Sequence, residues 1–292
     1  MDKLSRSLSE NVDYDFSDYP AYIRRAFLSS YPNYSALSHW HNDVEFLYVL
    51  SGKLKYNVNG KIIEIKSGEC IFVNSRQLHY GFSDTREECI FLCILLHPMQ
   101  LCSTSAIEKK YVTPLISNSA FSFCLLNNEE EWQKSIIDNI SRLYFSLDKA
   151  CPELFIQSIF YDIWLKLFEN MPQENMTRED ISFDLSAVKN MLKFIHDNYS
   201  AKISLDEIAL MGKVCKNKCC QLFKSYLNKS PVKYLISYRL EKSVELLKNT
   251  DKNITEIAFD VGFTGTSYYV ETFRKQYGES PKIFRKNNFG GN

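Results

Sequence analysis

Three of the five histidines lie in one pattern with a glutamate. His39 and His41 are separated by one residue, Glu45 follows four residues later, and His79 comes further along the same half of the chain. Alternating residues of a strand face the same way, so His39 and His41 are expected to project together. Neutral imidazoles with a carboxylate suit iron, manganese or zinc. Burying these groups unpaired would cost several kcal/mol, so the pattern predicts a polar cluster with hydrogen-bonding partners, a water-filled cavity or a ligand.

The segment that must position this cluster has the pattern of an antiparallel β domain. Short runs of β-branched and aromatic residues alternate with turn residues from about Tyr22 to Leu96. Asn59-Gly60 is a strong hairpin signal, because both positions tolerate positive φ. We expect a barrel or sandwich with strands at Val44–Leu50, Leu54–Val58, Ile62–Ile65, Cys70–Val73 and Ile90–Leu96.

Helical periodicity follows the β region. Apolar residues recur at helical spacing from Trp132 to Leu147 and again from Leu154 to Leu167, which predicts two amphipathic helices. Their apolar faces are expected to pack on the barrel, and an alternative is that part of the stripe forms a homodimer seam. The expected organisation is a mobile arm (1–20), a sensing and dimerisation domain (21–170), a linker (171–183) and a C-terminal domain (184–292).

Charge is distributed unevenly along the chain, although the 292 residues carry no net charge. From Asp184 to Asn292 there are 18 Lys and Arg against 11 Asp and Glu, a net charge of +7, which leaves −7 for the rest. This asymmetry favours a polyanionic partner for the C-terminal part alone. The nine cysteines are scattered, no secretory signal opens the chain, and no apolar run is long enough to cross a membrane. We therefore expect a cytoplasmic protein with reduced thiols.

A short pattern occurs twice in the C-terminal part. Ser204–Ala209 and Asn253–Ala258 each combine a capping residue with a glutamate three residues later, the signature of a helix start. A second helix is expected after each, over about 216–226 and 266–277, with a long helix beginning at Pro231 between the two units. The all-α C-terminal domain is thus predicted to carry two helix-turn-helix units.

The second unit and its flank resemble the C-terminal signature of the AraC/XylS family of transcription regulators. The resemblance covers about 100 residues when the first unit and the spacer helix are included. It implies two recognition helices in successive major-groove segments of DNA. The residues that carry it are Ile257-Ala258, Gly262-Phe263, Ser267-Tyr268, Phe273-Arg274-Lys275, Tyr277-Gly278, Ser280-Pro281 and Phe284-Arg285.

The same resemblance assigns the DNA-contacting positions by their place on each recognition helix. In the first helix they are Lys216, Asn217, Cys220, Gln221 and Lys224, and in the second Thr266, Ser267, Val270, Glu271 and Arg274. Asn and Gln can bind adenine through two hydrogen bonds, whereas Glu271 stands where an arginine is common, would be repelled by phosphate and can accept from a cytosine amino group. We expect the first helix to carry most base discrimination. Cys215, Cys219 and Cys220 are interpreted as structural, with a redox or metal switch as the alternative.

The histidine pattern resembles the two motifs of the cupin superfamily, whose barrel can hold a metal on two His, a Glu and a further His. The first motif fits in full, while the second has Asn74 in place of a usual proline and lacks one glycine. In sensor domains of AraC-like regulators the same pattern implies a small-molecule pocket. We rank that pocket first, structural hydrogen bonding second and a bound metal third. The implied effector-binding residues are His39, His41, Glu45, Tyr48, Asn74 and His79.

Two functional hypotheses follow. The leading one is an α+β regulator, without an enzymatic activity or a cofactor, in which a small polar effector in a cupin-like barrel controls DNA binding by a homodimer. A sugar is the family-based expectation for the effector. The partners are double-stranded DNA, the effector and, as a further candidate, RNA polymerase. The alternative is a metal-dependent cupin enzyme with an attached DNA-binding domain, whose metal candidates are His39, His41, Glu45 and His79.

Overall fold

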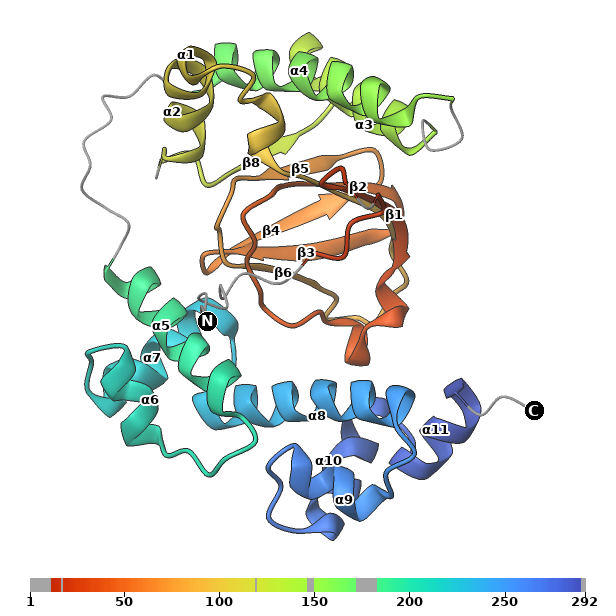
Figure 1. Ribbon diagram of the computed structural model, residues 1–292, viewed down its shortest axis with the longest axis vertical. Coiled ribbons are helices and arrows are strands. Elements are labelled where there is room, and N and C mark those ends of the chain that lie inside the picture. The colour runs from red at the N-terminus through yellow and green to blue at the C-terminus, as the bar shows by residue number, and fades with distance from the viewer. Residues whose placement is uncertain (1–11, 17, 119, 146–149, 172–182, 290–292) are drawn as a thin grey trace. The chain divides into compact units, whose positions relative to one another are not determined.

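The computed structural model describes residues 12–16, 18–118, 120–145, 150–171 and 183–289. The chain divides into two compact units, Met1–Asp180 and Ile181–Asn292, and each is described here by itself (Figure 1). Within the described residues, no helix combines the length and the apolar character needed to cross a membrane.

The N-terminal unit contains two antiparallel sheets. The larger has the order β1-β7-β2-β5-β8 and the smaller the order β4-β3-β6. The strands are β1 (Ala21–Phe27), β2 (Val44–Ser51), β3 (Lys53–Val58), β4 (Lys61–Lys66), β5 (Cys70–Val73), β6 (His79–Phe82), β7 (Ile90–Leu96) and β8 (Phe123–Leu126). All five predicted strands are present, and β1, β6 and β8 were not singled out from the sequence.

Alternation along β2 gives this unit two separate cores. Leu47 and Val49 face the space between the sheets, where they pack with residues such as Leu54 and Val58 of β3. Val44 and Phe46 point the other way, into a second core beneath the helices. Glu45 is two residues from Leu47 on β2 and therefore faces the same side, so the predicted cluster of Glu45 and the three histidines can lie between the sheets.

Two long helices cover the outer face of the larger sheet, as Figure 1 shows. They are α3 (Glu131–Tyr144) and α4 (Pro152–Asn170), and they follow the short helices α1 (Ser105–Ile107) and α2 (Thr113–Ile116). Buried residues of α3 and α4 join the core of Phe46 and Phe72. The expectation that both helices pack on the β domain is confirmed.

The turn between β3 and β4 has the predicted conformation. Asn59 and Gly60 both have positive φ, at 51° and 88°. A glycine is also required at Gly52 (φ 81°), where a Cβ atom would clash with the carbonyl oxygen of Glu88. This constraint fixes the turn between β2, which carries Glu45, and β3, which carries Tyr56.

The structure adds detail to three expectations about architecture. Of the expected barrel or sandwich, the strands form two antiparallel sheets of five and three strands, and the barrel is not closed. The arm (1–20) is not detached where it is described: Asp15 accepts hydrogen bonds from the backbone of Ile23 and from Arg24, and Tyr19 packs on the helix-covered core. Of the expected linker, Met171 is buried in that core, Phe183 begins a helix, and 172–182 lie outside the described residues.

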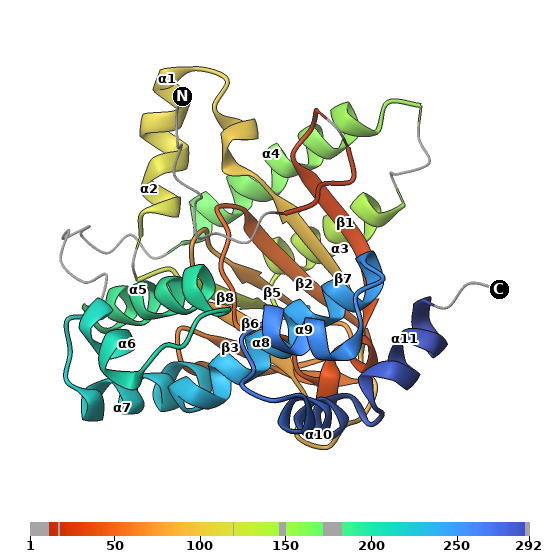
Figure 2. The same ribbon diagram turned by 60° about the horizontal axis from the view of Figure 1, so that its bottom comes forward.

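The C-terminal unit is helical. Its elements are α5 (Phe183–Asn198), α6 (Leu205–Met211), α7 (Lys216–Leu227), α8 (Pro231–Asn249), α9 (Ile254–Asp260), α10 (Thr266–Tyr277) and α11 (Pro281–Phe289). Figures 1 and 2 show α8 running between the α6–α7 pair at one end and the α9–α10 pair at the other. Both predicted helix-turn-helix units and the spacer helix are present.

Helix capping explains why each unit starts where it does. Ser204 and Asn253 accept a hydrogen bond from the backbone N–H of Glu207 and Glu256, whose carboxylates accept from the capping residue in return. These reciprocal bonds satisfy donors that the first helical turn leaves without partners. Both capping boxes therefore form as the sequence predicts.

Candidate ligand site and DNA-reading surface

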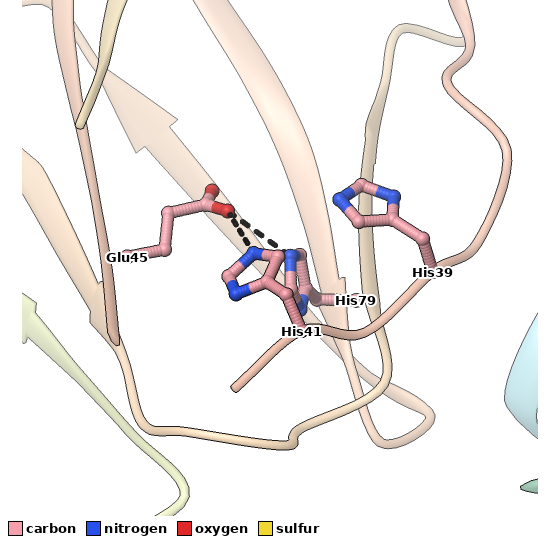
Figure 3. A group of neighbouring side chains, drawn as sticks. All are labelled: His39, His41, Glu45 and His79. Carbon is pink, nitrogen blue, oxygen red and sulfur yellow. Dashed lines mark hydrogen bonds and ion pairs between the residues drawn. The ribbon is translucent and has the colours of Figure 1, made fainter. Parts of the chain in front are cut away.

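The three histidines and Glu45 come together between the two sheets. One ligand atom from each of His39, His41, Glu45 and His79 lies within 4.8 Å of the others. Figure 3 shows His39 and His41 on one segment, with His79 beside them and Glu45 opposite. The His39–His41 segment is not a regular strand. Instead, His39 and His79 form an isolated bridge with two backbone hydrogen bonds, which joins the two sequence motifs.

Each imidazole is held through its Nδ1 atom by a carbonyl oxygen two residues away. The acceptors are the carbonyls of Leu37 for His39, Asp43 for His41 and Gln77 for His79, at 2.9, 3.1 and 2.8 Å. In the neutral ring this assigns the proton to Nδ1 and leaves the lone pair on Nε2. The protein thus fixes the tautomer of all three rings in the same way.

Glu45 is the acceptor at the centre of the cluster. Its Oε2 atom lies 3.3 Å from Nε2 of His41 and 3.0 Å from Nε2 of His79. The Nε2 atom of His79 is buried and is not aligned for a hydrogen bond. Burial would raise the pKa of Glu45, but His79 and His41 hold it well below its ordinary value. Burial lowers the pKa of His79 in spite of Glu45.

Tyr56 is a site residue that the sequence reasoning missed. Its hydroxyl donates to Oε1 of Glu45, so both oxygens of that carboxylate are engaged. Burial and Glu45 together raise the pKa of Tyr56 well above its ordinary value, so the hydroxyl keeps its proton. The signal was available, because Leu54, Tyr56 and Val58 alternate along β3 and all face the interior.

Two residues expected in the effector site do not belong to the cluster. Tyr48 packs in the core beneath the helices, because it is three residues from Glu45 on the same strand and so points to the opposite face. Asn74 donates to the carbonyls of Leu115 and Phe121 and accepts from the backbone of Ser75. It therefore ties the end of β5 to the segment before β8.

The first recognition helix presents most of its predicted DNA contacts to solvent. Asn217, Gln221 and Lys224 are exposed on α7, while Cys219, Leu222 and Phe223 are buried beneath them. Lys216 is exposed and forms an ion pair with Asp206 of α6 at 2.8 Å. Cys220 is half-buried. The apolar side of α7 is thus fixed in the core, and its polar side is available to DNA.

The second recognition helix has the same division. Ser267, Glu271 and Arg274 are exposed on α10, Thr266 and Val270 are half-buried, and Tyr269 and Phe273 lie in the core. Thr272 is half-buried and donates to the carbonyl of Tyr268. The structure places the ten predicted DNA-contacting residues on two helices, and contact with DNA itself stays a prediction.

Comparison with known protein families matches both units. A helix-turn-helix domain family matches residues 213–287, and a cupin domain family matches residues 29–95. The first match spans both recognition helices, and the second contains the complete histidine cluster. The chain is therefore a DNA-binding transcription regulator with a cupin-type N-terminal domain.

Relatives extend the match over nearly the whole chain. An uncharacterized HTH-type transcriptional regulator, YdeC of Bacillus subtilis, is 27% identical over 98% of both chains. The melibiose operon regulatory protein of Escherichia coli is 23% identical over 92% of this chain and 89% of its own. The chain is thus similar to HTH-type transcription regulators over nearly its whole length. The crystal structure of an apo ToxT variant from Vibrio cholerae shares the fold, with a TM-score of 0.50 at 14% identity over 91% of this chain and 96% of that one.

Proposed function

We propose that the cluster of His39, His41, Glu45 and His79 is the regulatory ligand site of this transcription regulator. The observation that carries the proposal is that ligand atoms of three histidines and one buried carboxylate lie within 4.8 Å of one another. Such a cluster is costly to bury without a partner. A ligand that binds it more tightly in one conformation changes DNA affinity by the corresponding coupling free energy. The relatives are regulators, and we assign the cluster no catalytic role.

A polyhydroxylated molecule such as a sugar is the first candidate ligand. Its hydroxyls can donate to the Nε2 lone pairs and accept from other groups of the site. His39 is only half-buried while the other three residues are buried, so a ligand has an approach from the His39 side. The melibiose operon regulatory protein, a relative over most of its length, is named for the operon of a sugar.

A divalent transition metal is the second candidate, favoured by the ring orientations. The Nε2 atoms of His41 and His79 face the same oxygen of Glu45, an arrangement that needs either a ring proton or a metal ion between each nitrogen and that oxygen. Metal-binding histidines usually donate their other ring nitrogen to a carbonyl or carboxylate, as all three do here. A bound ion would be held by these three rings and Glu45, and it would supply the missing positive charge.

Homodimerisation is a further part of the proposal. The solvent side of α4 carries Leu154, Tyr161 and Leu165, with Leu154 72% and Leu165 54% exposed. With Ser158 these residues are four, three and four apart, the spacing of a seam between two helices. A second copy of α4 is the partner that supplies an equivalent stripe. We also propose that the protein acts in the cytoplasm and that its macromolecular partners are double-stranded DNA and RNA polymerase.

The test compares ligand binding with its effect on DNA. Chelator-treated full-length protein would be titrated with zinc, manganese or ferrous ions, and separately with a panel of sugars, while DNA affinity is measured on sites selected from random sequence. The active ligand should change DNA affinity by about 5- to 150-fold. His79→Ala and Glu45→Gln should abolish that response and leave ligand-free DNA binding nearly intact.

His97→Asn is the matched control. His97 lies outside the cluster and caps a short helical turn by accepting from the backbone of Met99, a role that asparagine can retain. This variant should respond like the wild type. An undiminished response in both His79→Ala and Glu45→Gln would remove the regulatory role, and the cluster would then be structural.

A further inference from the structure

The two recognition helices can be aligned residue by residue, because their supporting structure repeats. From the first turn of each helix onward, a residue of α7 corresponds to the residue of α10 fifty positions later. Buried Phe223 corresponds to buried Phe273, and both helices end at a left-handed residue, Asn228 (φ 52°) and Gly278 (φ 84°). A serine and a proline then begin the next helix in both units. The solvent faces can therefore be compared position for position.

On those faces Glu271 corresponds to Gln221. The neighbouring positions pair Asn217 with Ser267 and Lys224 with Arg274, so the flanking chemistry stays polar or basic. Position 271 alone changes an amide, which both donates and accepts, into an anion that only accepts. Glu271 therefore faces any DNA bound to α10 with a restricted choice of partners.

The carboxylate of Glu271 has no intramolecular partner among the described residues. Arg274 and Lys275 are three and four residues further along α10, a spacing that permits ion pairs, yet neither lies within 4.0 Å of it. Other acids of this unit are engaged. Asp260 pairs with Lys252 at 2.8 Å, and Glu256 belongs to a capping box. Glu271 is thus an exposed anion in the middle of a DNA-reading face.

Only one kind of group in the major groove suits this anion. Phosphates repel it, and guanine and thymine present acceptor oxygens that repel it as well. Adenine offers an amino group, but its N7 acceptor lies beside that donor. Cytosine offers its N4 amino group without a neighbouring acceptor on the same base. A carboxylate at this position accordingly selects cytosine, partly by excluding the other bases.

We propose that Glu271 is a base-reading residue that requires cytosine at one position of the DNA segment contacted by α10. This inference rests on the DNA-binding function of the two units and is independent of the ligand in the N-terminal unit. The proposal also changes the roles expected for the two helices. The amides of α7 suit adenine, and α10 also discriminates between bases instead of only positioning the protein on DNA.

The test is selection of binding sites from random DNA by the full-length wild type and its variants. Wild-type sites should contain one invariant cytosine in the segment contacted by α10. Glu271→Ala should lose that preference by about tenfold or more. Glu271→Gln should shift it toward adenine, because glutamine can bind adenine through two hydrogen bonds. Gln221→Ala should change the preference at a different position.

Two controls separate base reading from net charge and from folding. Glu245→Gln removes one negative charge from α8, at a side chain that pairs with Lys242, and should leave the selected sequence unchanged. Wild-type protein tested on a site whose critical cytosine lacks its 4-amino group should lose the same affinity as on a mismatched site. The proposal is overturned if the Glu271 variants select the wild-type sequence and only bind all DNA more tightly.

Discussion

At the scale of single residues, the three imidazoles of the cluster are held by carbonyls of their own chain segments. His39, His41 and His79 each donate to a carbonyl two residues away, so their orientation depends on local backbone rather than on distant side chains. Rings fixed in this way lose little entropy when a ligand binds. The cluster is therefore suited to the ligand-binding role that we propose for it.

Acid should destabilise the N-terminal unit because of this arrangement. The pKa of His79 is lowered in the folded protein, so below about pH 6.5 the unfolded chain binds a proton that the folded chain does not. The pKa of Glu45 is also lowered, and its stabilisation is present above its ordinary value of 4.5 and lost as pH falls through the folded-state pKa. Both effects reduce stability in the same direction as pH falls.

Tryptophan fluorescence can measure this effect in the N-terminal unit alone, because the three tryptophans, Trp40, Trp132 and Trp164, all lie there. Urea unfolding of the chelator-treated full-length protein should show a lower midpoint at pH 5.5 than at pH 7.5. His79→Ala should reduce this difference. An equal dependence on pH in the wild type and in the variant would contradict the role given to His79.

At the scale of elements, α4 serves two different surfaces. Residues such as Ile156, Ile163 and Leu167 are buried against the sheet, while Leu154 and Leu165 remain exposed on the opposite side. Because exposed apolar side chains are unfavourable in water, the second apolar side of α4 favours contact with another helix. A negative charge introduced into the exposed stripe would face its own copy across a two-fold axis.

Leu165→Glu should therefore weaken dimerisation by on the order of a hundredfold, since a like-charge pair in an interface costs several kcal/mol. Sedimentation of the full-length protein measures the change. Glu153→Gln, at an exposed position of the same helix, should leave the wild-type dimer intact. A wild type that sediments as a monomer on DNA with two half-sites would exclude this seam.

Local signals explain which elements were predictable from the sequence. The capping boxes at Ser204 and Asn253, the turn at Asn59-Gly60 and the apolar stripes depend on near neighbours, and all of them formed as expected. The choice between a barrel and a sandwich, and the order of the strands in each sheet, depend on pairing between distant strands, so alternation alone could not decide them. The exclusion of Tyr48 from the site could have been predicted. Tyr48 is three residues from Glu45 on one strand, and residues an odd number apart on a strand face opposite sides.

At the scale of the whole molecule, the boundary at 180/181 separates two units that have their own cores. The C-terminal unit contains both recognition helices and also α5, although the helix-turn-helix family match begins only at residue 213. Met191, Leu192 and Ile195 of α5 are buried. They supply part of the core on which α6 and α7 are supported.

A fragment of residues 181–292 should therefore fold alone and bind DNA weakly as a monomer, while the full-length dimer should bind paired half-sites more tightly through avidity. Its DNA affinity should not respond to the ligand of the N-terminal unit. A fragment of residues 201–292, which lacks α5, should lose cooperative unfolding of the first helix-turn-helix unit. Circular dichroism and DNA titration distinguish these outcomes, and equal stability of the two fragments would contradict the role of α5.

The spacer helix α8 sets a fixed length between the two reading helices. Tyr234 at its start contacts Phe223 of the first unit, and Leu240 and Leu247 lie in the core of the second. Nineteen helical residues measure about 28 Å, close to the roughly 34 Å of one turn of B-form DNA. We therefore expect the two DNA segments contacted by α7 and α10 to require a fixed spacing along the duplex. A base change within one segment should weaken binding by degrees, whereas an insertion of a few base pairs between the segments should prevent both helices from binding at once.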